Sequence, residues 1–120
     1  MAKITLSNDT LTITLSPADK LWSMHGSFAL PLTHVTGAQA ATENGWHYAW
    51  NKIIGTNAPG IKIAGTYFSG DGLVFCDFGT GQNCVEITTS HERYAKLIVE
   101  LDPDEDRDAI VAQINAAAVK

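Results

Sequence analysis

The densest group of side chains suited to binding lies near the middle of the chain. Trp46, Tyr48 and Trp50 occur at alternate positions, His47 lies among them, and Lys52 follows closely. Aromatic side chains bury a large area at a small cost in side-chain entropy, so such a cluster can bind a planar ligand or a partner protein. The same cluster can also act as a hydrophobic plug that packs a long connection against the core. The sequence leaves both interpretations open, and these five residues form the first part of a candidate binding surface.

A glycine-rich element, Gly-Thr-Asn-Ala-Pro-Gly, follows at residues 55–60. A phosphate-binding loop would need consecutive backbone N–H groups that lead into a helix, with a lysine that reaches the phosphate. This element contains a proline, lacks the Gly-Lys-Ser/Thr ending and precedes a strand pattern, so a turn whose glycines take positive φ explains it better. A binding role is the alternative, and it would involve Gly55, Thr56, Pro59 and Gly60.

No combination of residues points to a reaction. Ser90, His91 and Asp77 could form a triad on paper, and Cys76 could act with a distant histidine, but no nucleophile elbow or family signature accompanies them. Ser90 and His91 are better explained as part of a polar turn between two strands. The histidines have no metal-binding spacing, and His34, which alternates with apolar neighbours, is expected inside the barrel. The sequence therefore predicts no enzyme activity, no metal and no cofactor.

Length and charge limit the class of protein. The chain has 120 residues, enough for one domain with a hydrophobic core, and it carries a net charge of -5. Its basic residues are scattered, so nucleic acid and anionic lipid are not expected partners. The first residues alternate between apolar and polar and do not form an apolar leader, and no apolar run is long enough to span a bilayer. We therefore expect a cytoplasmic protein.

Alternation of apolar and polar residues dominates the chain and indicates strands. Residues 4–6 and 11–15 are expected to form a hairpin around a Ser-Asn-Asp turn, and a third strand is expected at about residues 32–41. Residues 42–60 fit neither the strand nor the helix period, which indicates a long, apolar connection. Further strands are expected at residues 61–68, 73–78, 84–88 and 94–101. About seven short strands are typical of a small antiparallel β-barrel or sandwich.

The strands at residues 73–78 and 84–88 are expected to pair as a second hairpin, with Cys76 opposite Cys84. Directly opposed Cβ atoms lie about 4.5–5.5 Å apart, which is wider than a disulfide prefers. A cytoplasmic location also favours reduced cysteines. We therefore expect two free thiols that pack as small apolar side chains.

One face of this hairpin is wholly apolar and suits the core, whereas the opposite face still carries Val74, Cys76 and Phe78. A contiguous apolar surface of this kind on a small domain is usually covered. The cover would be a second subunit, which would make a homo-oligomer and most simply a homodimer, or residues 46–54 of the same chain. Phe78 therefore joins the candidate binding surface.

The chain is expected to end in one helix, at about residues 103–118. Asp102 is a good N-cap, Pro103 suits the first helical position, and the acidic residues that follow favour the positive end of the helix dipole. Capping explains this acidic run, which lacks the glycine and glutamate of an EF-hand calcium loop. Ile110 and Ile114 belong to an apolar stripe at helical spacing, which we expect to be buried over an open end of the barrel.

Several stretches resemble bacterial pleckstrin-homology-like proteins, a loosely defined and mostly uncharacterised group. They are residues 11–16, 30–35, 55–60, 65–67 and 94–103, and the Gly-Thr-x-x-Pro-Gly element within them is the most specific. The resemblance implies a small barrel closed by one C-terminal helix, with a binding or assembly role and no shared catalytic residues. Eukaryotic pleckstrin-homology domains bind phosphoinositides through basic residues in the first loops between strands. Here the first loop reads Ser-Asn-Asp-Thr at residues 7–10, so phosphoinositide binding is not expected.

Residues 1–120 are therefore expected to form one pleckstrin-homology-like domain, mainly β with one C-terminal helix, whose strands lie between about residues 3 and 101. The leading hypothesis is a non-catalytic module that binds a protein partner, or a second copy of itself, through an apolar surface near residues 46–60. The alternative is a small barrel that holds a small apolar or aromatic ligand, which a cavity on the order of several hundred Å³ would favour. A small enzyme is the third and weakest candidate.

Overall fold

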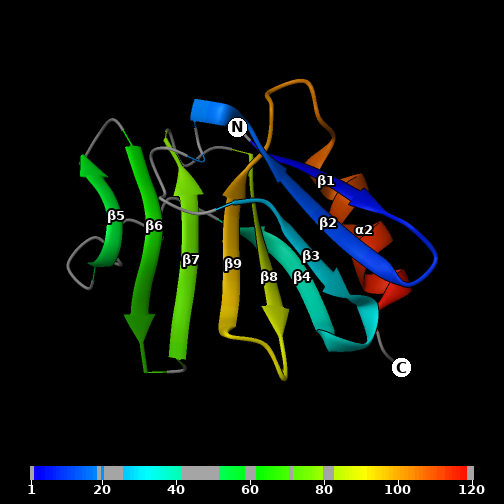
Figure 1. Cartoon of the computed structure of the whole chain (residues 1–120). Helices are drawn as coiled ribbons and strands as arrows, with labels where there is room; N and C mark the ends of the chain where they lie inside the picture. The colour runs from blue at the N-terminus through cyan, green and yellow to red at the C-terminus, as the bar shows by residue number, and fades with distance from the viewer. Residues whose placement is uncertain are drawn as a thin grey trace.

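The computed structural model describes residues 2–18, 20, 26–41, 52–58, 62–70, 72–79 and 83–118. Within them the chain is mainly β with one C-terminal helix, α2, as the sequence predicts. The described strands form two sheets and not a closed barrel, and they number nine where about seven were expected. Figure 1 shows the smaller sheet, β1 to β3, and α2 beside the β4 and β8 end of the larger sheet.

A three-stranded antiparallel sheet forms one layer. β1 (Ala2–Leu6) and β2 (Thr10–Leu15) make the hairpin that the alternation predicts, and β3 (Phe28–Pro31) pairs with the other side of β2. The Ser7 N–H closes the turn by donating to the Thr10 carbonyl oxygen at 2.9 Å. Alternate residues of β2 point to the same face, and the buried ones are Leu11, Ile13 and Leu15.

The second layer is a six-stranded sheet with the spatial order β4-β8-β9-β7-β6-β5. Its strands are β4 (Val35–Ala41), β5 (Lys52–Ala58), β6 (Lys62–Ser69), β7 (Gly72–Phe78), β8 (Cys84–Thr89) and β9 (Tyr94–Glu100). β9 lies between β7 and β8, parallel to β7 and antiparallel to β8. The predicted hairpin of β7 with β8 is therefore wrong. β9 takes the place between them because its apolar residues suit burial on both faces, as seen at Leu97, Ile98 and Val99.

Two further strand predictions need correction. The strand expected at residues 32–41 begins only at Val35, because Leu32–His34 form a short 3-10 helix, η1, between β3 and β4. The connection expected over residues 42–60 contains β5, which pairs with β6 as the end strand of the larger sheet. Backbone pairing at a sheet edge does not require alternating side chains, so the pattern gave no sign of β5. The rest of this connection, residues 42–51 and 59–60, lies outside the described residues.

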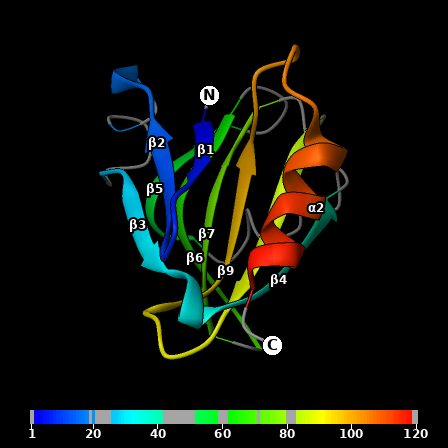
Figure 2. The ribbon, with the colours of Figure 1, turned by 90° about the vertical axis from the view of Figure 1, so that its right-hand side faces the viewer.

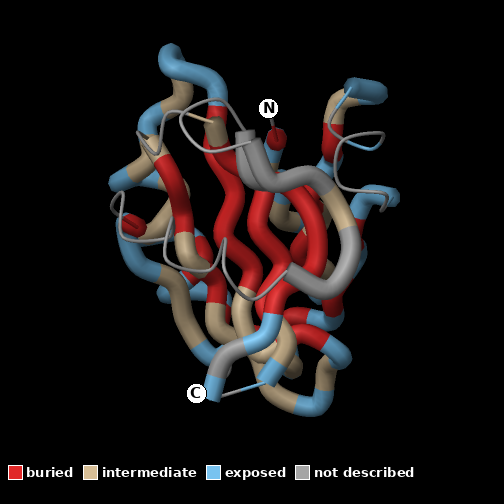
Figure 3. Tube along the Cα trace, turned by 90° about the vertical axis from the view of Figure 1, so that its left-hand side faces the viewer, coloured by how far each residue is buried: buried red, intermediate tan, exposed pale blue. Residues whose placement is uncertain are grey.

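Two apolar cores cover the two faces of the larger sheet. The first core lies between this sheet, the three-stranded sheet and α2, and the second lies on the opposite face. Figure 3 shows long buried stretches along the interior strands and exposed residues at the turns. The face that each residue occupies agrees with the prediction. Phe75, Val85 and Ile87 lie in the first core, whereas Val74, Cys76 and Phe78 lie in the second.

The second core is already buried within the single chain. Val74 and Cys76 have no exposed area, and Phe78 is only 1% exposed. A second subunit is therefore not needed to cover this face. The predicted homo-oligomer depended on this apolar face being uncovered in the single chain, and the face is buried.

Neither Cys76 nor Cys84 forms a disulfide and both are buried, as predicted, although they are not opposite each other. β9 separates them: Cys76 pairs with Ile98, and Cys84 pairs with Glu100. Burial raises the pKa of the Cys76 thiol well above its usual value, and the nearby Cys84 adds to the increase. Both cysteines therefore act as small apolar side chains of the second core.

α2 (Arg107–Ala117) begins about four residues later than the sequence predicts. Asp106, and not Asp102, is the N-cap, because its carboxylate accepts a hydrogen bond from the Ala109 N–H at 3.1 Å. The Asp102 carbonyl oxygen accepts from the Glu105 N–H at 3.0 Å. The predicted start signal at Asp102 therefore belongs to a turn that precedes the helix.

α2 lies against β4 and β8, at the side of the first core and not over the end of a barrel (Figure 2). Asn115 fixes it to β4, because its Oδ1 accepts from the Ala38 N–H at 2.8 Å and its amide donates to the Ala38 carbonyl at 2.9 Å. Ile114 is fully buried in the first core, whereas Ile110 is only partly buried beside it. The predicted burial is confirmed for Ile114. Ile110 is less buried than predicted.

Replacement of Ile114 by alanine is expected to lower the free energy of unfolding by about 2–5 kcal/mol, because it leaves a cavity in the first core. Denaturant unfolding followed by circular dichroism measures the change. Gln113→Ala, at an exposed neighbouring position of α2, is the control and should change this free energy by less than about 0.5 kcal/mol. An unchanged unfolding midpoint for Ile114→Ala would contradict the packing of α2 on the sheets.

Candidate functional site

Most of the predicted binding surface lies outside the described residues, namely Trp46, His47, Tyr48, Trp50, Pro59 and Gly60. Lys52, Gly55 and Thr56 lie on β5, at the edge of the larger sheet. Phe78 is buried in the second core, so its side chain is not accessible to a partner of the folded chain. The described part of the structure thus does not bring the predicted residues together into one surface.

Gly55 takes the positive φ expected of the glycine-rich element, but it does so within β5 and not in a turn. Its φ is 125°, and its partner on β6, Gly65, has a φ of 143°. A Cβ at Gly55 would lie 2.1 Å from the Ala64 carbonyl oxygen. Glycine is therefore needed here so that the two backbones can approach each other. This supports a structural role for Gly55.

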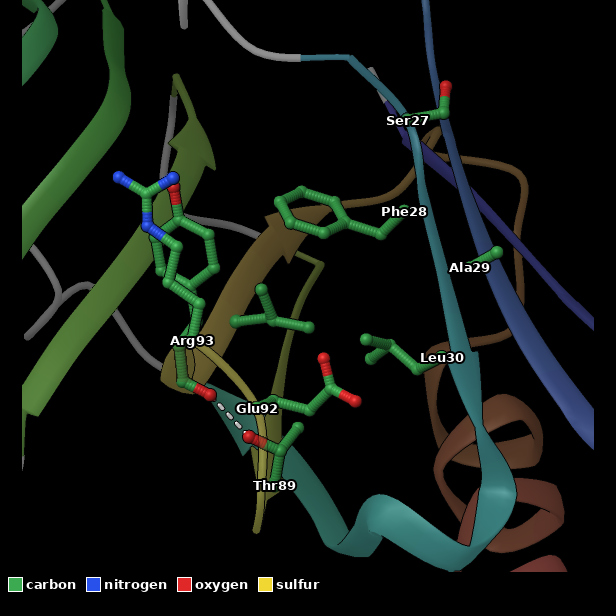
Figure 4. Close-up of a pocket in the computed structure, with 9 residues that line it drawn as sticks. Ser27, Phe28, Ala29, Leu30, Thr89, Glu92 and Arg93 are labelled. Carbon is green, nitrogen blue, oxygen red and sulfur yellow. Dashed lines mark hydrogen bonds between the residues drawn. The ribbon is translucent and has the colours of Figure 1, made fainter.

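A cleft of about 230 Å³ opens between the two sheets (Figure 4). Phe28 and Leu30 point into it from β3. Leu97 of β9 also lines it. The opposite wall is formed by the end of β8, the turn that follows it and the start of β9. Glu92 and Arg93 belong to this turn, and both line the cleft.

The apolar part of the cleft is held rigidly. The rings of Phe28 and Tyr94 meet edge to face with centroids 5.7 Å apart, and each also contacts Phe75 of the first core. The Tyr94 hydroxyl lies 2.7 Å from the Thr66 hydroxyl, in a buried hydrogen bond. On the other side, the Thr89 hydroxyl donates to the Tyr94 carbonyl oxygen, as the dashed line in Figure 4 marks. The cleft is therefore a preformed apolar site.

Glu92 contacts the imidazole of His34 at the edge of the cleft. Its Oε2 lies 2.5 Å from Nδ1 of His34, and both side chains are partly exposed. The Ser90 N–H donates to the His34 carbonyl oxygen at 2.8 Å, so two contacts join the β8–β9 turn to η1. His34 thus lies at the protein surface beside the turn. The expectation that it would lie inside a barrel is wrong, because η1 interrupts the strand there.

Arg93 is the exposed cation of the cleft. Its guanidinium carbon lies 5.6 Å from the centroid of the Tyr94 ring, a cation–π contact. Figure 4 shows the Arg93 side chain extending along this wall, away from the carboxylate of Glu92. Within the described residues, Arg93 forms no ion pair. The cleft therefore combines apolar walls with a positive group at its opening.

A row of apolar side chains leads from the cleft across the larger sheet. Tyr94 of β9 pairs with Leu73 of β7, and Leu73 pairs with Phe68 of β6. Paired residues of neighbouring strands point to the same face. Exposure increases along the row, from 5% at Tyr94 to 51% at Phe68, the one large apolar residue exposed among those that the structure describes.

The residues that could have formed a triad do not meet. Asp77 pairs with Val99, near the far end of β9 from the turn that holds Ser90 and His91. Across the described ranges, no group of three or more histidines, cysteines and acids could hold a metal ion. No helix in the same ranges has the length and apolarity required to cross a bilayer.

No sequence motif indicates this cleft. One side comes from Ser27 and the β3 residues Phe28–Leu30, and the turn contributes Glu92 and Arg93, about sixty residues later in the chain. The polar turn at residues 90–93 was recognised, and it does connect two strands. Its relation to β3 follows only from the packing of the two sheets.

No protein-family model, curated protein or solved structure matches this chain.

Proposed function

We propose that the chain is a non-catalytic, pleckstrin-homology-like binding module that holds an apolar side chain of a protein partner in the cleft between β3 and β9. The mainly β chain with a helix after the last described strand supports this comparison, although the described strands form two sheets and not a closed barrel. The cleft supports the binding role.

The observation that carries the proposal is a rigid, apolar cleft of small size. Sites for small molecules usually have volumes of about 300–1,000 Å³, whereas this cleft has about 230 Å³. Such a space suits one side chain of a protein better than a whole small ligand. Binding energy between proteins is often concentrated in a few apolar side chains that enter pockets of this kind.

A selection from random heptapeptides displayed on phage tests the proposal. Selected peptides are expected to share one apolar or aromatic residue and, when synthesised, to shift the methyl NMR signals of Leu30 and Leu97, which line the cleft. The methyl signals of Leu6, on the far strand β1 of the smaller sheet, should not move. Peptides that bind but shift only signals away from the cleft would show that the binding site lies elsewhere.

A cleft-filling variant provides the second measurement. Leu30→Phe places a larger side chain where Leu30 now points into the cleft. It is expected to weaken binding of the selected peptides about tenfold or more, while circular dichroism and the thermal midpoint show that the domain still folds. Unchanged affinity in a folded Leu30→Phe protein would contradict the proposal.

A further inference from the structure

We infer that the partner segment is extended and acidic: an apolar side chain enters the cleft, and an adjacent carboxylate of the same segment pairs with Arg93. This inference rests on the proposed function and adds the chemical class of the partner. Charge at the opening, the shape of the neighbouring surface and the edge position of β3 support it.

The charged groups at the opening of the cleft favour an acidic partner. Two charged side chains, Glu92 and Arg93, line the cleft, and they differ in their surroundings. The Glu92 carboxylate already contacts the imidazole of His34 at 2.5 Å, whereas Arg93 has no ion-pair partner among the described residues. The group left to meet a ligand is therefore the guanidinium. Arginine binds carboxylates strongly because its planar group donates two parallel hydrogen bonds.

The position of Arg93 makes the pairing specific. Its guanidinium lies over the ring of Tyr94, whose other neighbours fix it in place, so the cation is held beside the apolar walls. A carboxylate that pairs with Arg93 is thus next to an apolar group bound between Phe28 and Leu97. In a segment with an apolar residue followed by aspartate or glutamate, the apolar side chain can enter the cleft while the carboxylate pairs with Arg93.

The surface beside the cleft suits an extended segment. The row from Tyr94 through Leu73 to Phe68 spans two strand spacings, or about 9.5 Å. About three residues of an extended chain cover that length, at roughly 3.3 Å per residue. A segment anchored in the cleft can therefore pass Arg93 and reach the exposed ring of Phe68.

β3 is the end strand of the smaller sheet, and Phe28, Ala29 and Leu30 of this strand line the cleft. Figure 4 shows β2 on the side of β3 that faces away from the cleft. Extended peptides commonly bind along the edge strands of sheets. An extended form of the partner segment agrees with this position.

A set of capped heptapeptides tests the inference. Each has leucine, phenylalanine or tryptophan at its centre, followed by aspartate, asparagine or lysine, with glycine and serine elsewhere. With the wild-type chain, titrations followed by NMR are expected to show the aspartate peptides binding roughly five- to tenfold more tightly than the asparagine peptides, with the lysine peptides weakest.

Arg93→Gln is expected to remove the difference between the aspartate and asparagine peptides, while the affinity for the asparagine peptides changes little. Raising the salt concentration should reduce the same difference in the wild-type chain. Lys3→Gln, which removes one positive charge at an exposed position of β1, is the matched control and should leave the preference intact.

The outcomes separate this inference from the proposed function. If aspartate and asparagine peptides bind equally and both shift Leu30 and Leu97, the pairing with Arg93 is wrong and the cleft remains a binding site. If the preference for aspartate persists in Arg93→Gln, the pairing is also wrong. If none of the peptides shifts the cleft signals, both proposals are overturned.

Discussion

A Phe78→Glu variant is expected to lower the free energy of unfolding by about 4 kcal/mol or more, a large part of the stability of a domain of this size. Phe78 is 1% exposed and belongs to the second core with Tyr67 and Ile98. The substitution removes an aromatic side chain from this core and places a carboxylate in an apolar environment. Denaturant unfolding followed by circular dichroism, at equal protein concentrations, measures the loss.

Phe68→Glu is the matched control, because it makes the same chemical change at a residue that is 51% exposed on β6. It is expected to change the free energy of unfolding by less than about 0.5–1 kcal/mol. Sedimentation equilibrium adds a second readout. If Phe78→Glu is as stable as the wild type and merely converts a dimer into a monomer, Phe78 belongs to an interface between subunits and not to an internal core.

Gly55→Ala is expected to lower the free energy of unfolding by about 3 kcal/mol or more, or to release β5 from β6. The added Cβ would lie 2.1 Å from the Ala64 carbonyl oxygen and 2.6 Å from Cα of Gly65, both backbone atoms that cannot rotate away. The φ of 125° at Gly55 is also unfavourable for alanine. Thermal unfolding measures the global effect, and hydrogen exchange of the β6 amides reports the loss of the neighbouring strand.

Gly70→Ala provides the control, since a Cβ there has no heavy atom within 4 Å and the residue lies in an exposed turn. Its thermal midpoint should stay within a few degrees of the wild-type value. Equal midpoints for Gly55→Ala and the wild type, together with unchanged exchange of β6, would contradict the close pairing of Gly55 with Gly65.

The alternation of side chains predicted the faces of the strands correctly even where it failed to predict their partners. Phe75 and Val85 lie in the first core and Cys76 in the second, as the pattern indicates, because a strand's faces follow from its own two-residue period. The pairing of β7 with β8 was wrong, because the insertion of β9 between them depends on contacts that no local turn signal encodes. Start signals were similarly incomplete for α2. Asp102 and Pro103 are typical of a helix start, but the chain first makes a turn and is then capped by Asp106.

The candidate site was less predictable than the fold. The aromatic cluster and the glycine-rich element can be recognised as candidate sites because their residues are adjacent in sequence. Most of these residues lie outside the described part of the structure. The cleft instead joins β3 to the β8–β9 turn, and each segment alone reads as an ordinary strand or a polar turn. Only the packing of two sheets brings Leu30 close to Leu97 and Arg93 to the opening between them. Sequence patterns describe neighbours along the chain, and this site is made of neighbours in space.

The order of strands in the larger sheet also has a consequence for how the domain folds. β9 is synthesised after the other described strands, yet it occupies an interior position between β7 and β8. Before residues 94–100 are available, β8 with β4 and β7 with β6 can form only two separate antiparallel parts, each with an open edge. The parallel pairing of β7 with β9 also joins residues about twenty positions apart, and contacts of long sequence separation slow folding. The cooperative step of folding therefore requires β9. Without β9, the incomplete chain exposes two unpaired sheet edges, which favour aggregation.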